Sequence, residues 1–418
     1  DEKTGQSSFE KIQKLEQNKT IAENEYLKFV NTTINTNPEL SRHFSGGFHP
    51  RKLKTDKNRQ LIPEDLVVLS YLPANEKLYI FAATSDTVVA KVVDVTTDEL
   101  NKNIKYLYNF ASHALGGNQT DALRVARGDD SSPIPGKFNT SESKYKEVSE
   151  LLFNWTIEPV RDVLNIKEKV VVIPTGMLHF LPFQMLGQKL PSGKFDFLIE
   201  HYTLFYAHSI EMLYQSKERI GEISILAMAN ADKTLPASEQ EVKDLKAMYP
   251  NTDVFIHELA SEDKAKTSTG KHNILHFATH GNLDYFDYHK SYLTLAPNEA
   301  GGEDGKLTIE EVWEIEDIYS YQMVTLSACK TALTEDFNTG WAVSPATSFI
   351  DAGAPTVVAS LWAVNDASTA LLMKYFYRNL STMSKVEALR RAQIELSQNP
   401  KFSHPYYWSP FILIGDYR

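Results

Sequence analysis

Cysteine is nearly absent from this sequence, because Cys329 is the one cysteine among 418 residues. The chain therefore forms no internal disulfide bond, which fits a reducing compartment, and we expect a cytoplasmic protein. No apolar run approaches the roughly 18 residues that a membrane span requires, so we expect no membrane-spanning segment. The chain begins Asp1-Glu2-Lys3 without a charged-then-apolar leader, so we expect any signal peptide to be absent or already removed.

Basic residues are also fewer than acidic residues. There are 43 Lys and Arg residues against 54 Asp and Glu residues, which gives a net charge of −11. The average surface field would repel a polyanion, so we expect no direct binding to nucleic acid and none to anionic lipid. Hydrophobic residues at 42% and charged residues at 23% are typical of a soluble globular protein.

Several motifs of other enzyme classes are missing. Neither G-x-G-x-x-G nor a complete G-x-x-x-x-G-K-[ST] occurs, which argues against nucleotide binding, and the absence of G-x-S-x-G argues against a serine hydrolase. His272, His276 and His280 follow one another at intervals of four residues. They belong to a strand that runs into a turn, not to the helical face of a zinc hydrolase, so we expect no metal site.

The N-terminal part of the chain has its own pattern. Residues 8–36 carry apolar side chains at roughly helical spacing, and residues 37–63 hold glycines, prolines and basic residues that suit a linker. We therefore expect residues 1–61 to form a helical segment and linker. Strand-like runs follow at Leu66–Tyr71, Lys77–Ala82, Thr87–Val93, Val170–Ile173 and Thr203–Ala207, with helical stretches at 97–115 and 144–163. These predict a first α/β unit over residues 62–217.

Strands and helices alternate clearly over residues 218–418. The expected strands are Ile223–Ala229, Asp253–His257, Asn273–Phe277, Tyr292–Leu295, Met323–Ser327, Thr356–Leu361 and Phe411–Ile414. The expected helices are Ser238–Met248, Glu262–Ser268, Thr308–Glu314, Ser344–Ala352, Ala367–Leu380 and Lys385–Ser397. Such alternation predicts a mostly parallel sheet flanked by helices.

Two chemically reactive side chains come just after apolar strands. The run Asn273–Phe277 leads into Ala-Thr-His280-Gly281, and the run Met323–Ser327 leads into Ala-Cys329. Ligands of open parallel sheets bind beyond the carboxyl ends of the strands, which makes these two ends candidate site positions. A thiol nucleophile needs a histidine to move protons and backbone N–H groups to hold an oxyanion. Gly281 and Cys329 suit the second task, since a glycine lets a substrate approach closely.

A simpler interpretation is available for each residue. A lone cysteine is most often a small buried hydrophobe, and a histidine in a strand-end turn is often a satisfied polar group. The spacing of Cys329 and His280 does not decide between these interpretations.

The sequences around both residues resemble the active-site motifs of the CHAT family, the caspase-like peptidases associated with tetratricopeptide repeats. The similar segments are Ile274-Leu-His-Phe-Ala-Thr-His-Gly281 and Val324-Thr-Leu-Ser-Ala-Cys-Lys-Thr331. Further segments resemble other landmarks of the family: Ile173–Phe183, Tyr206–Ser209, Leu235–Val242, Gly353–Asp366 and Pro405–Gly415. The resemblance covers residues 62–418.

This resemblance implies a caspase-like α/β fold, with a catalytic half at 218–418 preceded by a smaller non-catalytic half at 62–217. It also implies a cysteine endopeptidase related to separase and the caspases, with Cys329 as nucleophile, His280 as proton-transfer partner and no metal or organic cofactor. His276 is then expected to be structural. Lys330 and Ala332 stand where family members usually have an acidic residue and a glycine, a departure that concerns the substrate cleft and not the dyad.

Two interpretations of Asp366 remain open. The segment Leu361-Trp-Ala-Val-Asn-Asp366 resembles the separase stretch whose aspartate lines a pocket for a basic residue before the scissile bond. A buried carboxylate prefers a cationic partner. Alternatively, Asp366 caps the helix expected at Ala367–Leu380, because aspartate is favoured at that position.

The family resemblance also implies a biological setting. It points to bacterial signalling or defence, to a protein substrate cut at few sites, and to activation by a partner protein or ligand. The acidic, glycine-rich loop 298–305 is a candidate for ordering on activation, although an ordinary surface loop has the same composition. A scaffold or interaction protein that keeps the fold without peptidase activity is the alternative function.

Overall fold

The computed structural model describes residues 62–74, 76–112, 142–165, 167–214, 222–267, 270–284, 288–298, 302–328 and 344–418. Cys329 lies outside the described residues, and so does the segment 1–61 that was expected to be helical. The expected boundary at residue 217 also falls in one of these gaps. The division of the chain into those domains therefore stays a prediction.

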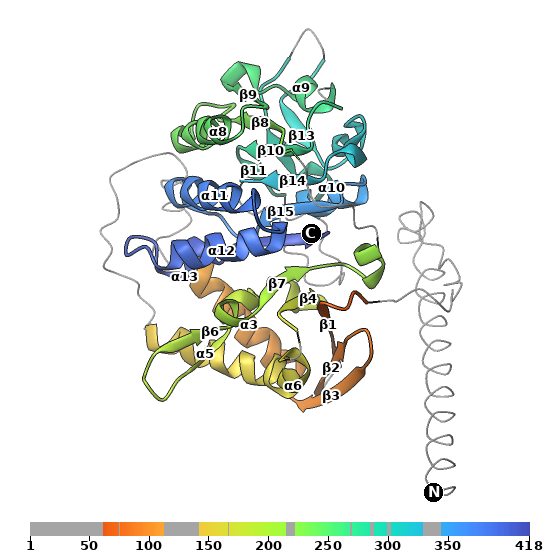
Figure 1. The fold of residues 1–418 in the computed structure, drawn as a ribbon, viewed down its shortest axis with the longest axis vertical. Coiled ribbons are helices and arrows are strands. Elements are labelled where there is room, and N and C mark those ends of the chain that lie inside the picture. The colour runs from red at the N-terminus through yellow and green to blue at the C-terminus, as the bar shows by residue number, and fades with distance from the viewer. Residues whose placement is uncertain are drawn as a thin grey trace, which may run out of the picture. The chain divides into compact units, whose positions relative to one another are not determined.

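Within the described residues, eleven strands form one sheet in the order β3-β2-β1-β4-β7-β16-β15-β14-β10-β8-β9 (Figure 1). One part contains β1 (Leu66–Ala74), β2 (Lys77–Ala83), β3 (Val88–Asp94), β4 (Lys169–Ile173) and β7 (Thr203–Tyr206). The other contains β8 (Ile225–Ala229), β9 (Thr252–Ile256), β10 (Ile274–Ala278), β14 (Met323–Leu326), β15 (Thr356–Ser360) and β16 (Phe411–Gly415). Neighbours are parallel except at β1–β2, β2–β3 and β15–β16. The predicted α/β fold with a mostly parallel sheet is confirmed.

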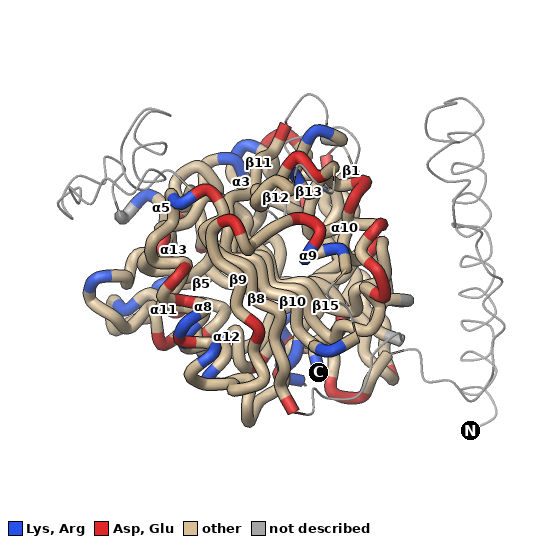
Figure 2. Tube along the Cα trace, turned by 90° about the horizontal axis from the view of Figure 1, so that it is seen from above, with Lys and Arg blue, Asp and Glu red and all other residues tan. Residues whose placement is uncertain are grey.

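Helices cover both faces of this sheet. They are α3 (Thr97–Ser112), α5 (Glu142–Thr156), α6 (Arg161–Leu164), α7 (Leu198–His201), α8 (Pro236–Met248), α9 (Glu262–Thr267), α10 (Pro345–Asp351), α11 (Asp366–Leu380), α12 (Lys385–Ser397) and α13 (Pro405–Trp408). Helices α8, α11 and α12 lie on one side of the strands β8, β10, β14 and β15, with α9 and α10 on the other (Figures 1 and 2). Every residue of these four strands is buried, as expected for strands covered on both faces.

The C-terminal strand β16 joins the two parts of the sheet. It pairs antiparallel with β15, from Thr356↔Gly415 to Ser360↔Phe411, and parallel with β7. Strands β4 and β7 therefore run opposite to β15, β14, β10 and β8. Their carboxyl ends lie at the opposite edge of the sheet, so the edge that carries the candidate site is formed by the strands of the C-terminal half.

Two expected helices are wrong in part. The expected helix 144–163 ends at Thr156 and is followed by the 3₁₀ helix Glu158–Val160, because Pro159 disfavours the α conformation in the residue before it. The expected helix Thr308–Glu314 is instead the end of strand β13 (Lys306–Thr308) and a 3₁₀ helix at Glu311–Glu314. The Glu311 carboxylate accepts hydrogen bonds from the Thr308 amide and hydroxyl, which stabilises a tight turn in place of an α-helix.

Some short strands were not expected from the sequence. β13 and β11 (Gly281–Asn282) pair with β12 (Tyr292–Thr294), which the sequence did predict, and β5 (Gly187–Lys189) pairs with β6 (Phe195–Phe197). Segments of two or three residues are too short to show a period of two.

A buried ion pair connects α12 to the end of β16. Lys385 Nζ lies 3.0 Å from Asp416 Oδ2, and each side chain is 1% exposed. The same ammonium donates to Thr356 Oγ1 at 2.9 Å, at the start of β15. The pair therefore holds together the three elements that meet where the halves of the sheet join.

Replacing Lys385 by alanine should lower the free energy of unfolding by about 3 kcal/mol, because it leaves the Asp416 carboxylate buried with little compensation. Arg418 Nε lies 3.5 Å from Asp416 Oδ1, but its side chain is 46% exposed and is screened by solvent. Urea denaturation measures the effect. Lys306→Ala is the control, since Lys306 is 52% exposed and pairs with Asp304 at 3.9 Å. Equal effects of both changes would contradict the prediction.

Candidate active site

Four neighbouring parallel strands end at the same edge of the sheet. Their registers match Ala229 with Ala278, Phe277 with Leu326, and Thr325 with Val358. The residues that follow β8, β10, β14 and β15 therefore lie side by side, although they are far apart in the sequence. The sequence placed His280 and Cys329 after two of these strands, β10 and β14, which are direct neighbours.

Backbone pairing fixes the position of His280. Its carbonyl accepts a hydrogen bond from Thr294 N of β12 at 2.8 Å. The hydroxyl of the preceding residue, Thr279, donates to the Thr294 carbonyl. The His280 side chain is 19% exposed. Hydrogen bonds to Thr294 thus hold the backbone that carries the imidazole, while the side chain remains partly accessible to solvent.

The backbone N–H of Gly281 points away from β12. Gly281 pairs with Leu293 in the antiparallel β11–β12 ladder. The bond from Thr294 N to His280 O flanks this pair, as it does at positions where the two opposed residues do not bond each other. The N–H of Gly281 is therefore not used by β12 and is directed to the other side of its strand.

The chain is held in place up to the residue before Cys329. Ser327 N donates to the Phe277 carbonyl at 2.8 Å, and Ser360 Oγ donates to the Ala328 carbonyl at 2.7 Å. Ala328 is therefore attached to β15 beyond the end of β14. Cys329 itself lies outside the described residues, so its pairing with His280 stays a prediction.

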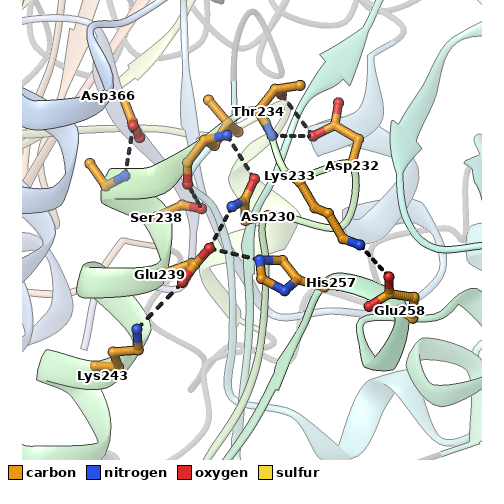
Figure 3. A network of polar contacts seen from close by, with 12 residues as sticks. Asn230, Asp232, Lys233, Thr234, Ser238, Glu239, Lys243, His257, Glu258 and Asp366 are labelled. Atoms are coloured by element: carbon orange, nitrogen blue, oxygen red, sulfur yellow. Dashed lines mark hydrogen bonds and ion pairs between the residues drawn. The ribbon is translucent and has the colours of Figure 1, made fainter. Parts of the chain in front are cut away.

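Thr234 and Asp232 contact the His280 ring from the segment after β8. Thr234 Oγ1 lies 2.6 Å from His280 Nε2, and Asp232 Oδ2 lies 3.7 Å from the same nitrogen. The Thr234 hydroxyl and amide donate to Asp232 Oδ1 at 2.7 and 3.2 Å (Figure 3). Neither residue was predicted from the sequence to belong to the site. The signal was present, because they follow a buried strand that ends at the same edge.

The segment 230–237 is held by its own hydrogen bonds (Figure 3). Asn230 adopts a positive φ of 48°; its Oδ1 accepts from Leu235 N at 2.7 Å, and its Nδ2 donates to Glu239 Oε1 at 2.7 Å. Glu239 also pairs with His257 at 2.7 Å. The hydrogen bonds from Asn230 and His257 lower the pKa of Glu239, so its carboxylate is charged and holds this network.

Asp366 contacts the C-terminal end of the segment 230–237, at Ala237. Its Oδ2 accepts a hydrogen bond from Ala237 N in the first turn of α8 at 2.9 Å, while no described residue donates a hydrogen bond to Oδ1. Asp366 does not cap its own helix, because Asn365 is the N-cap of α11 and accepts from Ser368 N at 3.0 Å. The capping interpretation is therefore wrong. Burial raises the pKa of the Asp366 carboxyl to about 6.

His276, four residues before His280, is fully buried. Its Nε2 lies 2.8 Å from Glu241 Oε1, and its Nδ1 lies 3.0 Å from the Tyr377 hydroxyl. The Tyr377 hydroxyl also lies 3.0 Å from Thr325 Oγ1 of β14. Both ring nitrogens of His276 are thus engaged within the core, and its position is that of a structural residue.

The comparisons with known proteins show the family and the fold. The family model described as "CHAT domain" matches residues 146–416, more than half of the chain. The chain belongs to the CHAT-domain family. Tetratricopeptide repeat protein 28 of Mus musculus is 24% identical over 307 residues, and that of Homo sapiens is 22% identical. In both cases the match covers 59% of this chain and 12% of the relative's length.

Among solved structures, the chain is similar to separase in the Saccharomyces cerevisiae separase–securin complex. The TM-score is 0.54 at 11% identity, over 84% of this chain and 30% of that chain. This similarity shows a shared caspase-like fold. The family and fold expected from the sequence are both confirmed. Within the described residues, no helix of this CHAT domain is both long and apolar enough to cross a membrane.

Two groups of side chains in the described part of the CHAT domain have the spacing of metal ligands. One is Asp196, Glu200 and His201, and the other is Glu262, Glu303 and Glu311. In the second, Lys266 Nζ lies 2.8–3.3 Å from a carboxylate oxygen of each of four residues, Glu262, Glu303, Glu311 and Glu314. Burial raises the pKa of Glu262 to about 7. The lysine already supplies the positive charge, and Glu303 of the acidic loop is one of its partners.

Replacing His276 by alanine should lower the free energy of unfolding by about 3 kcal/mol, because Glu241, 2% exposed, loses its partner. Chemical denaturation followed by tryptophan fluorescence measures the change. His201→Ala is the matched control, since His201 is 54% exposed and pairs with Asp196 at the surface. We expect this control to change stability by less than about 1 kcal/mol. A His276→Ala protein as stable as the control would refute the structural role.

Proposed function

We propose that this CHAT domain is a cysteine endopeptidase in which Cys329 is the nucleophile and His280 moves the proton. The observation that carries the proposal is the partly exposed His280, held at the end of β10 beside the strand that leads to Cys329. Family membership and the caspase-like fold support it. A structural histidine would resemble His276, with both ring nitrogens engaged in the core.

The proposed reaction uses these groups in two steps. His280 takes the thiol proton, the thiolate attacks the scissile carbonyl, and the resulting oxyanion is held by the N–H groups of Gly281 and Cys329. The C–N bond then breaks, and His280 returns the proton to the leaving amine. Water, deprotonated by His280, hydrolyses the thioester and regenerates the thiol. The N–H of Gly281 supports this assignment because β12 does not use it.

Asp366 is proposed to favour a basic residue before the scissile bond. It lies at the same edge as His280, and the two are connected through the segment 230–237 by the contacts with Ala237 and Thr234. No described residue donates to its Oδ1 atom, and a carboxylate in that setting suits a guanidinium or ammonium group. We expect a protein substrate cut at few sites.

The proposed setting is the cytoplasm of a bacterium, in signalling or defence, with activation by a partner protein or ligand. This part of the proposal rests on the resemblance of the motifs to the family. The similar separase structure contains a second protein, securin, which supports a search for a protein partner of this chain.

Peptide cleavage tests the dyad. The wild-type chain should cut members of a peptide library, Cys329→Ala should cut none, and His280→Ala should be slower by about 10²-fold to 10⁴-fold, the contribution of general acid–base catalysis. His201→Ala, an exposed histidine of the N-terminal half, should cut like the wild type. Cleavage by Cys329→Ala would reject the proposal. If the wild type neither cuts nor reacts with a thiol-directed peptide electrophile, the scaffold function replaces it.

The Asp366→Asn variant tests specificity and keeps an oxygen that accepts from Ala237 N. We expect the preference for Arg over Gln before the scissile bond to fall about 10-fold to 100-fold, the contribution of a charge-assisted hydrogen bond. In the wild type this preference should increase between pH 5 and 7.5, because the carboxyl, with its pKa of about 6, is neutral at the lower pH. An unchanged preference in Asp366→Asn would contradict the pocket assignment.

A further inference from the structure

We infer that Asp232 and Thr234 form a relay that orients His280 and selects which of its ring nitrogens carries the proton. The inference rests on the proposed function, because it assigns these residues a role in moving the thiol proton. They do not touch the substrate in this proposal. They are positioning residues that act through His280.

Counting protons gives the direction of each hydrogen bond. The Thr234 hydroxyl has one proton, and it donates that proton to Asp232 Oδ1 at 2.7 Å. Its oxygen can then only accept from His280 Nε2, which lies 2.6 Å away. Neutral His280 therefore carries its proton on Nε2. Nδ1 is left as the basic nitrogen that takes a proton from a thiol.

Asp232 places a carboxylate beside the His280 ring for the stage of the reaction at which the ring carries a positive charge. Asp232 Oδ2 lies 3.7 Å from His280 Nε2, and the Asp232 side chain is 36% exposed. When His280 becomes an imidazolium, the carboxylate attracts its positive charge and the threonine continues to accept from Nε2. The Asp232 carboxylate thus lies close to the ring on which positive charge develops as the thiolate attacks.

The geometry of the relay is set before any substrate binds. Lys233, between the two relay residues, has a positive φ of 65°, and its amide donates to the Asn230 carbonyl at 3.1 Å. Its side chain forms an ion pair with Glu258 (Figure 3). Asn230 N in turn donates to the Ala278 carbonyl at 3.1 Å, two residues before His280. The segment is therefore attached to the same strand that carries the histidine.

Matched threonine variants test the relay in the full chain. Thr234→Val removes the hydroxyl with little change of shape, and we expect kcat to fall about 10-fold to 100-fold while KM changes by less than about twofold. Thr234→Ser restores the hydroxyl and should recover kcat to within about threefold of the wild type. Asp232→Asn should also lower kcat, as Thr234→Val does. Thr267→Val, whose hydroxyl bonds to the Asp263 carbonyl in α9, should have no effect. An unchanged kcat in Thr234→Val would overturn the inference.

A measurement without turnover separates this inference from the peptidase proposal. In protein labelled with ¹⁵N-histidine, the His280 signal, assigned by its loss in His280→Ala, reports which ring nitrogen is protonated. We expect the Nε2–H form in the wild type and a mixture of both forms in Thr234→Val. The Nδ1–H form in the wild type would overturn the relay even if peptides are cut. The Nε2–H form in a chain that neither cuts peptides nor reacts with the thiol-directed electrophile would leave the relay standing and reject the peptidase.

Discussion

The pairing of the C-terminal strand β16 is the constraint on which the rest of the structure depends. β16 is antiparallel to β15 and parallel to β7, so one continuous sheet contains two sets of strands that run in opposite directions. The buried Lys385–Asp416 pair holds this junction to α12. Because of the reversal, the edge that carries His280 is formed by the strands β8, β10, β14 and β15. The opposite edge receives the carboxyl ends of β4 and β7.

At the site edge, one short segment connects two residues with proposed functions, His280 and Asp366. Residues 230–237 contact His280 through Thr234 and Asp366 through Ala237. The proposed proton transfer and the proposed recognition of a basic residue therefore depend on the same segment, which the hydrogen bonds of Asn230 and the ion pair of Lys233 hold in place. A distortion of this segment would affect both functions together.

Two histidines, one within β10 and one just after it, lie in very different environments. His276 and His280 have the same side chain and lie four residues apart. His276 is surrounded by the core, with Glu241 and Tyr377 on its two nitrogens. His280 lies just beyond the last residue of β10, is 19% exposed, and has Thr234 on one nitrogen. The position relative to the end of the strand, rather than the residue type, decides which of them is accessible for the proposed catalysis.

The sequence by itself determined the order of the main elements, the mostly parallel sheet and the family, because long buried strands and helices leave apolar runs with a regular period. It also singled out His280 and Cys329, since both follow such strands. It did not predict the break of the expected helix at Pro159 or the strand β13, where local turn chemistry replaced a helical pattern. Only the tertiary structure decided that Thr234, 46 residues before His280, orients its ring, and that Asp366 accepts from an amide 129 residues away. Contacts between distant segments leave no period in the sequence, because they arise when neighbouring parallel strands bring their carboxyl ends to one edge.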